Sequence, residues 1–215
     1  MYDLLLDAFV RLPGEALISE IRDGRFDALV LACTQLGAQG LCDGAGLVAS
    51  FRPYLAAEGP RRVLDELSVD RTALTGAACG GGPRPPYERL YITGSDRDGA
   101  VLTAVQSLYR KAGLLLDDDA GEPSDFLFVE LDFVKRLCLE ETEAWSHGRD
   151  GRATQALELQ FLREHPGRWA GAYCADAGKY ARTDFYRGFL AVLDNFMEAE
   201  IEYLEEGTIS AAGGR

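Results

Sequence analysis

The 215-residue sequence predicts an all-α fold. Apolar residues recur every three or four positions through most of the chain, which is the spacing of an amphipathic helix. The alternation of apolar and polar residues that marks a half-buried strand is scarce, so no stretch requires a sheet. Periodicity breaks at residues 76–86, GAACGGGPRPP, where three consecutive glycines and three prolines cannot sustain a helix. This segment is predicted to be either a linker between two helical halves or a long functional loop.

Two amphipathic helices are predicted in the N-terminal part, over residues 14–22 and 25–39. The apolar face of the second helix consists of Phe26, Leu29, Val30, Cys33 and Leu36. Residues 37–48 are rich in glycine, which predicts a loop or a frayed turn. Pro60 stands near the start of a further helix, where its missing N–H costs little.

Four helices are predicted in the C-terminal part, over residues 99–112, 123–143, 150–165 and 184–205. Gly113 is placed as a C-terminal cap of the first, and Pro123 as the opening residue of the second. Pro166-Gly167 is predicted to close the third, and Thr183 or Asp184 to cap the fourth. The inward face of the fourth is Phe185, Phe189, Val192, Phe196 and Tyr203. Residues 207–215 are predicted to be a disordered tail.

The charge of the chain restricts its partners. Asp and Glu number 35 against 22 Lys and Arg, giving a formal net charge of −13. Nucleic acids and anionic membrane surfaces are bound by basic residues, so both are disfavoured. A basic peptide would be attracted, although many acidic proteins have no such partner. The last predicted helix ends in five glutamates, which form either a solvated face or a contact surface for a basic partner: Glu198, Glu200, Glu202, Glu205 and Glu206.

The cysteines and the N-terminus favour a cytoplasmic location. The five cysteines form no C-x-x-C pair, and with two histidines in the chain a zinc site has no sequence support. An odd number of scattered cysteines suits a reducing compartment. Asp3 and Asp7 stand where a signal peptide needs positive charge, and no apolar run approaches the roughly 20 residues that span a bilayer.

No arrangement in the sequence indicates an enzyme. Gly80-Gly81-Gly82 is followed by no Gly-Lys-Ser/Thr and preceded by no strand, so a phosphate-binding loop is not predicted. His147 lies in a Ser-His-Gly loop, as expected of an exposed residue. His165 ends a helix four residues before Trp169, where a structural or binding role is favoured over catalysis. We expect no catalytic residue, no metal and no cofactor.

Three segments occur in an order that resembles a known family. They are PPYERLY at 85–91, EPSDFLFVELDFVKRLC at 122–138, and LQFLREHPGRW at 159–169 with DFYRGFL at 184–190. Together they are similar to the TorD/DmsD/NarJ-type chaperones of molybdoenzyme maturation, across roughly residues 64–204. The family's usual Asp-His pair is Asp125-Phe126 here, which suggests a divergent client.

The resemblance implies a TorD-like helical bundle, with a larger part and a smaller C-terminal part joined by a hinge near 76–86. We therefore expect one chaperone domain over residues 1–206. It also implies that the chain binds the N-terminal, often twin-arginine, leader of a molybdopterin oxidoreductase catalytic subunit until the cofactor is inserted. The leader-binding residues expected from the resemblance are Tyr87, Tyr91, Glu122, Asp125, His165 and Trp169.

Alternatives remain open at this level. A chaperone of the same family could serve a non-exported enzyme, as NarJ-type proteins do. A helical regulatory or ligand-binding domain is a remote alternative, because the acidic N-terminus does not suit a helix-turn-helix. Homodimerisation, including domain swapping across the glycine-rich segment, is left undecided.

Overall fold

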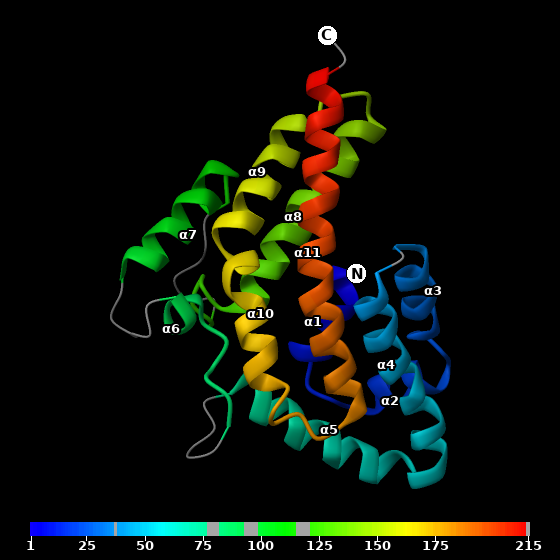
Figure 1. Cartoon of the computed structure of the whole chain (residues 1–215). Helices are drawn as coiled ribbons and strands as arrows, with labels where there is room; N and C mark the ends of the chain where they lie inside the picture. Colours follow the sequence, from blue (N-terminus) through cyan, green and yellow to red (C-terminus); the bar gives the residue numbers. More distant parts are fainter. Residues whose placement is uncertain (37, 77–81, 93–98, 115–120, 214–215) are drawn as a thin grey trace. The chain divides into compact units, whose positions relative to one another are not determined.

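The structure, a computed structural model, is all-α, as the sequence predicts (Figure 1). It describes all residues except 37, 77–81, 93–98, 115–120 and 214–215. Within these described ranges the only β-type pairing is an isolated bridge between Tyr87 and Phe126. The helices are α1 Tyr2–Phe9, α2 Glu15–Arg22, α3 Asp27–Leu36, α4 Gln39–Glu58, α5 Pro60–Thr75, α6 Glu88–Ile92, α7 Gly99–Lys111, α8 Leu127–Ser146, α9 Arg152–Glu164, α10 Pro166–Ala177 and α11 Asp184–Gly213.

The chain divides into two compact units. Unit 1 contains Asp3–Pro85 and Ala172–Phe196, and unit 2 contains Pro86–Gly171, Tyr2 and the chain from Met197 onward. The chain therefore passes from one unit to the other at Pro85–Pro86, at the end of the predicted hinge segment. Residues 77–81 of that hinge lie outside the described ranges, and the hinge and the single domain over 1–206 stay predictions.

The core of unit 1 is aromatic. Phe26 packs edge-on against Phe185 and Phe189 of α11, with ring centroids 5.5 and 5.6 Å away. Phe9 contacts Tyr186 at 5.5 Å, and the buried Tyr186 hydroxyl donates to the carbonyl of Ala8 at 3.1 Å. The predicted inward face of α11 is thus confirmed through Phe196, whereas Tyr203 is 68% exposed and Leu204 is buried in its place.

The predicted loop at 37–48 is wrong for residues 39–48, because they belong to α4, whereas residue 37 lies outside the described ranges. A Cβ on Gly44 would lie 2.8 Å from the carbonyl oxygen of Gly188, and a Cβ on Gly188 would lie 2.5 Å from that of Gly44. The two glycines therefore allow α4 and α11 to approach closely. Glycine lowers helix propensity by about 1 kcal/mol relative to alanine, but here the packing of two helices outweighs that local preference.

The start of α11 is fixed by a buried carboxylate on α5. Asp70 is 0% exposed and accepts hydrogen bonds from the backbone N–H groups of Arg182 and Thr183 and from the Thr183 hydroxyl, the last at 2.7 Å. The Thr183 Oγ1 in turn accepts from the N–H of Tyr186 at 3.4 Å. Thr183 is therefore the N-terminal cap that the sequence predicts.

In unit 2, α8 and α9 pack along each other (Figure 1). Tyr109 of α7, Phe133 of α8 and Phe161 of α9 form one ring cluster, with centroids 4.1 to 5.6 Å apart. Helix α8 begins at Leu127 rather than at Pro123, because Phe126 is extended and pairs with Tyr87. In a helix that began at Pro123, the N–H of Leu127 would donate to the Pro123 carbonyl. It donates instead to the Pro86 carbonyl, at 2.9 Å.

Helix α9 ends at Glu164 with His165 as its C-terminal cap, so Pro166-Gly167 closes the third helix as predicted. The sequence did not predict that Pro166 also begins α10, where proline at the first position is favourable. One further boundary differs from the prediction. Helix α11 continues to Gly213, into the residues predicted to be a disordered tail. Among the helices of the described ranges, none combines the length and apolar character needed to cross a membrane.

Candidate functional site

The six predicted leader-binding residues all belong to unit 2. They fall into two groups, which the consecutive residues Glu88 and Arg89 of the short helix α6 connect. Tyr87, Glu122 and Asp125 lie around Arg89, whereas Tyr91, His165 and Trp169 lie around Glu88 and Glu130.

Asp125 is held by α6. Its side chain is 0% exposed and forms an ion pair with the Arg89 guanidinium, and one carboxylate oxygen also accepts from the Arg89 backbone N–H at 3.3 Å. Its own carbonyl accepts from the N–H of Glu88 at 2.8 Å. Burial raises the pKa of the Asp125 carboxyl, and the hydrogen bonds and charge of Arg89 oppose that rise. This aspartate positions α6 against the start of α8.

Tyr87 and Glu122 lie nearer to solvent. The Tyr87 hydroxyl donates to Glu122 Oε2 at 2.8 Å, and Glu122 is exposed. The Tyr87 ring contacts Phe126 at 5.3 Å and carries the Arg89 guanidinium 4.7 Å from its centroid. Burial, followed by the bond to Glu122, raises the pKa of Tyr87 to about 12. Phe126, at the position where the resemblance led us to expect histidine, is thus a buried packing residue in this chain.

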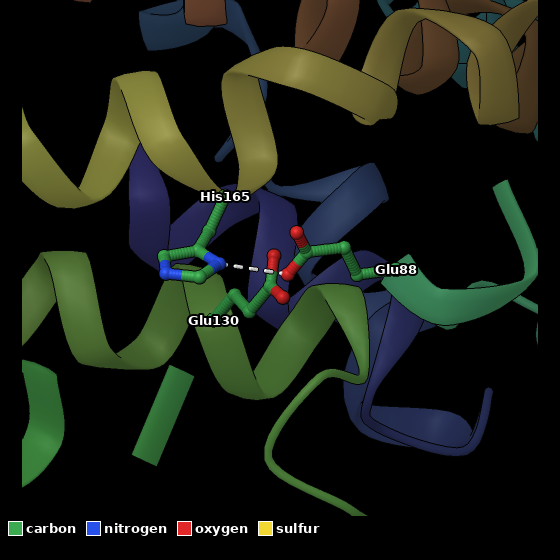
Figure 2. Close-up of side chains that lie close together, drawn as sticks. All are labelled: Glu88, Glu130 and His165. Atoms are coloured by element: carbon green, nitrogen blue, oxygen red, sulfur yellow. Dashed lines mark hydrogen bonds and ion pairs between the residues drawn. The ribbon is translucent and has the colours of Figure 1, made fainter. Parts of the chain in front are cut away.

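Two carboxyl groups and an imidazole meet in the interior of unit 2 (Figure 2). Glu88 of α6, Glu130 of α8 and His165, the C-terminal cap of α9, are all at most 3% exposed. His165 Nδ1 is hydrogen-bonded to Glu88 Oε2 at 2.8 Å. Burial, together with the negative charge of Glu88, raises the pKa of Glu130 well above its ordinary value. A backbone break at His165, with φ −123° and ψ −101°, directs the chain from α9 into α10.

Trp169 and Tyr91 cover one side of this cluster. The Trp169 indole N–H donates to Glu130 Oε2 at 3.2 Å, and the Tyr91 ring stacks on the indole with centroids 5.3 Å apart. Trp169 is 1% exposed, whereas Tyr91 is half-buried. Of the six predicted residues, Tyr87, Tyr91 and Glu122 are therefore at least partly exposed, whereas Asp125, His165 and Trp169 are buried.

Sequence reasoning missed Glu88, Arg89 and Glu130, which connect the predicted residues. One signal was available for Glu130. It stands in the buried stripe of α8 between Leu127 and Val134, where a charged residue is almost never buried without a partner. No comparable pattern marks Glu88 or Arg89, because α6 has only five residues.

A second acidic cluster also lies in unit 2. Cys138 of α8, Glu158 of α9 and Glu200 of α11 have side-chain atoms within 4.8 Å of one another. The Cys138 thiol donates to Glu158 Oε1 at 3.1 Å, and the Tyr2 hydroxyl donates to Glu200 at 3.4 Å. Burial raises the pKa of Glu158 to about 7, and burial also raises the pKa of Cys138 and Glu200. Either cluster has the donor types that hold a metal ion.

Unit 1 contains an open groove of about 760 Å³. Its apolar part is formed by Phe51, Tyr54 and Val69, and Val69 is 53% exposed. Charged residues of both signs surround it, namely Asp65, Glu66, Arg182, Asp184 and Arg187. The sequence offered no signal for this groove, since α4, α5 and the start of α11 form it together.

Comparison with known proteins identifies the family. The chain is 27% identical over 116 residues to the perchlorate reductase assembly chaperone protein of Dechloromonas aromatica, and 36% identical over 73 residues to the chlorate reductase assembly chaperone protein of Ideonella dechloratans. It is 23% identical over 120 residues to the chaperone protein TorD of Vibrio vulnificus. These matches cover 54%, 34% and 55% of this chain and 51%, 37% and 55% of the relatives, respectively.

The chain thus spans about half the length of the curated relatives it matches first. No solved structure gives a significant match. The model of the nitrate reductase delta subunit family matches residues 39–175, which include the whole of α4 and α5 and all six predicted site residues from Tyr87 to Trp169. The chain belongs to the nitrate reductase delta subunit family, the group of helical proteins that includes the TorD/NarJ-type chaperones.

Proposed function

We propose that this protein is a maturation chaperone that binds the N-terminal leader of a molybdopterin oxidoreductase catalytic subunit. It holds the subunit until the cofactor is inserted and, for an exported client, until export. The observation that carries this proposal is the family match over residues 39–175, together with relatives whose names describe reductase assembly chaperones and TorD chaperones. No catalytic step belongs to this role.

The charge of the protein supports a basic ligand. A twin-arginine leader carries two guanidinium groups, which carboxylates bind through paired hydrogen bonds. Glu122 is exposed, and its partner is the neutral Tyr87 hydroxyl rather than a cation. A leader arginine can take the place of that hydroxyl and gain a charged pair. The ring of Tyr87 and the half-buried ring of Tyr91 then offer apolar surface to the residues beside the arginines.

The groove in unit 1 supports a second location for the same ligand. Phe51, Tyr54 and Val69 suit the apolar stretch of a leader, and Asp65 and Glu66 suit its basic part. Glu66 already accepts hydrogen bonds from Tyr54 at 2.8 Å and from Arg62 at 3.0 Å, so a ligand has to compete for it. For this reason we favour Glu122 as the arginine contact.

A calorimetric titration with leader peptides from the host's molybdenum oxidoreductases tests the proposal. Each peptide is compared with versions whose Arg-Arg is changed to Lys-Lys or Ala-Ala. Tight binding that weakens with added salt and on loss of the arginines is expected of a twin-arginine leader. Binding that ignores the arginines would favour the alternative function, assembly of a non-exported molybdoenzyme. No binding of any leader would refute the leader-binding proposal.

Single-residue variants test which residues contact the leader peptide. Glu122→Gln should weaken binding roughly 10- to 100-fold, because a hydrogen bond to a charged group contributes about 1.5–3 kcal/mol. The control is Glu140→Gln, which removes the same charge from an exposed site on α8, outside both the predicted site and the glutamate-rich end of α11. A larger loss with Val69→Ser than with Glu122→Gln would move the contact to the groove of unit 1.

A further inference from the structure

We propose that Glu88, Glu130 and His165 form a binding site for one divalent transition-metal ion, for which Zn²⁺ is the probe. The potential ligand atoms of the three side chains all lie within 4.8 Å of one another. The side chains come from α6, α8 and the junction of α9 with α10, so an ion here would join three segments of unit 2. This inference does not depend on the proposed chaperone function.

An unsatisfied atom points to a missing ligand. Glu130 is 0% exposed, and its Oε1 has no hydrogen-bond partner, while Oε2 accepts from Trp169. Figure 2 shows the carboxyl groups of Glu88 and Glu130 and the imidazole of His165 directed toward one another. A buried carboxyl oxygen without a partner is costly, and a cation at this centre would bind it in its ionised form.

The donor set selects the class of ion. Imidazole and carboxylate ligands suit Zn²⁺ and neighbouring transition metals, whereas Mg²⁺ and Ca²⁺ prefer oxygen ligands alone. Two ionised carboxylates and a neutral imidazole around a divalent cation have no net charge, which suits a buried position. His165 Nδ1 already faces the Glu88 carboxyl group at 2.8 Å, on the side of the ring from which it would coordinate the ion.

The His165–Glu88 pair requires only a small adjustment to hold an ion. His165 Nδ1 and Glu88 Oε2 are now 2.8 Å apart. Metal bonds of about 2.0–2.2 Å at a tetrahedral centre place two ligand atoms roughly 3.4 Å apart. Moving these two atoms about half an ångström further apart therefore makes room for the ion, which takes the place of the proton between them. The Trp169 N–H would then orient Glu130 from outside the ligand set, as hydrogen-bond partners of metal ligands usually do.

Titration of Zn²⁺ into the chelator-treated full chain at neutral pH tests the site. One equivalent should bind, and the melting temperature should rise with Zn²⁺ concentration because the unfolded chain lacks the site. Glu130→Gln should weaken the binding by at least about tenfold, the minimum expected from loss of a charged ligand. Two variants should bind as the natural chain does: His147→Asn, which changes an exposed histidine, and Cys138→Ser, which changes the other cluster.

Three results would overturn the proposal. The first is the absence of one-to-one binding by the natural chain, which would leave the cluster as a shared-proton network. The second is binding that Glu130→Gln leaves intact, with circular dichroism showing that the variant is folded. The third comes from X-ray absorption of the natural chain with Zn²⁺, which does not depend on any variant. One imidazole nitrogen with oxygen ligands is expected, and sulfur or oxygen alone would exclude this site.

Discussion

The buried carboxyl of Glu158 should make the stability of the protein depend on pH. Its pKa in the folded chain is about 7, against an ordinary value of 4.5, and burial is the main cause. The folded state therefore holds the proton more tightly than the unfolded state. The stabilisation from this group is complete below pH 4.5 and is lost as the pH rises through about 7. The perturbation that isolates it is Glu158→Gln, which mimics the protonated carboxyl.

The size of the effect follows from the two pKa values. Each pKa unit corresponds to about 1.4 kcal/mol, so a shift from 4.5 to about 7 is worth on the order of 3 kcal/mol. Glutamine keeps an oxygen that accepts from the Cys138 thiol, which now lies 3.1 Å from Glu158 Oε1. Relative to the natural chain, the variant should thus gain on the order of 3 kcal/mol between pH 4.5 and pH 8.

Urea unfolding followed by circular dichroism at several pH values measures this difference. The control is Glu202→Gln, an exposed residue of α11 in the same unit, which should change the free energy of unfolding by a similar small amount at every pH. A difference between Glu158→Gln and the natural chain that stays constant from pH 4.5 to pH 8 would refute the reasoning. It would mean that Glu158 is solvated when ionised.

Two further predictions concern unit 1, and thermal or urea unfolding measures both. Gly44→Ala should destabilise the protein by about 1–3 kcal/mol, because the new Cβ would lie 2.8 Å from the Gly188 carbonyl oxygen. Gly46→Ala, two residues away on α4 with no atom within 4 Å of the new Cβ, should instead stabilise it by roughly 0.5–1 kcal/mol. Equal effects would contradict the close approach of α4 to α11. Asp70→Ala should cost about 1–3 kcal/mol for each donor left unpaired at the start of α11, whereas Asp65→Ala on the exposed face of α5 should have little effect. A small effect of Asp70→Ala would mean that water replaces the carboxylate.

The accuracy of the sequence prediction depended on how local each signal was. Pro60 at the start of α5 and Gly113 after α7 were placed correctly, because proline and glycine act on the backbone of their own segment. Gly113 has φ +74°, the left-handed conformation that a C-terminal cap requires. The glycine-rich start of α4 was misread because Gly40 and Gly44 lie against α11, more than 140 residues later in the sequence.

In the candidate site, too, the local features were predicted and the contacts between distant segments were not. The motif segments contain all six predicted residues, and these all lie in unit 2. Their connections were not predictable, because Arg89 pairs with Asp125 and Glu88 with His165 across long stretches of chain. The sequence also did not show which of these side chains are buried. Nothing local distinguishes exposed Glu122 from Asp125, three residues later, whose side chain is fully buried.

The sequence by itself determined the all-α class, most helix positions, the family and the acidic character of the protein, because periodicity, turn residues, motifs and charge are all properties of short segments or of composition. The tertiary structure alone decided that Glu88, Glu130 and His165 share one buried centre, that Asp70 holds the start of α11, and that two glycines let α4 approach α11. The physical reason is that burial and pairing depend on which distant segments pack together. Desolvation then sets the chemistry of each charged group, as for Glu158.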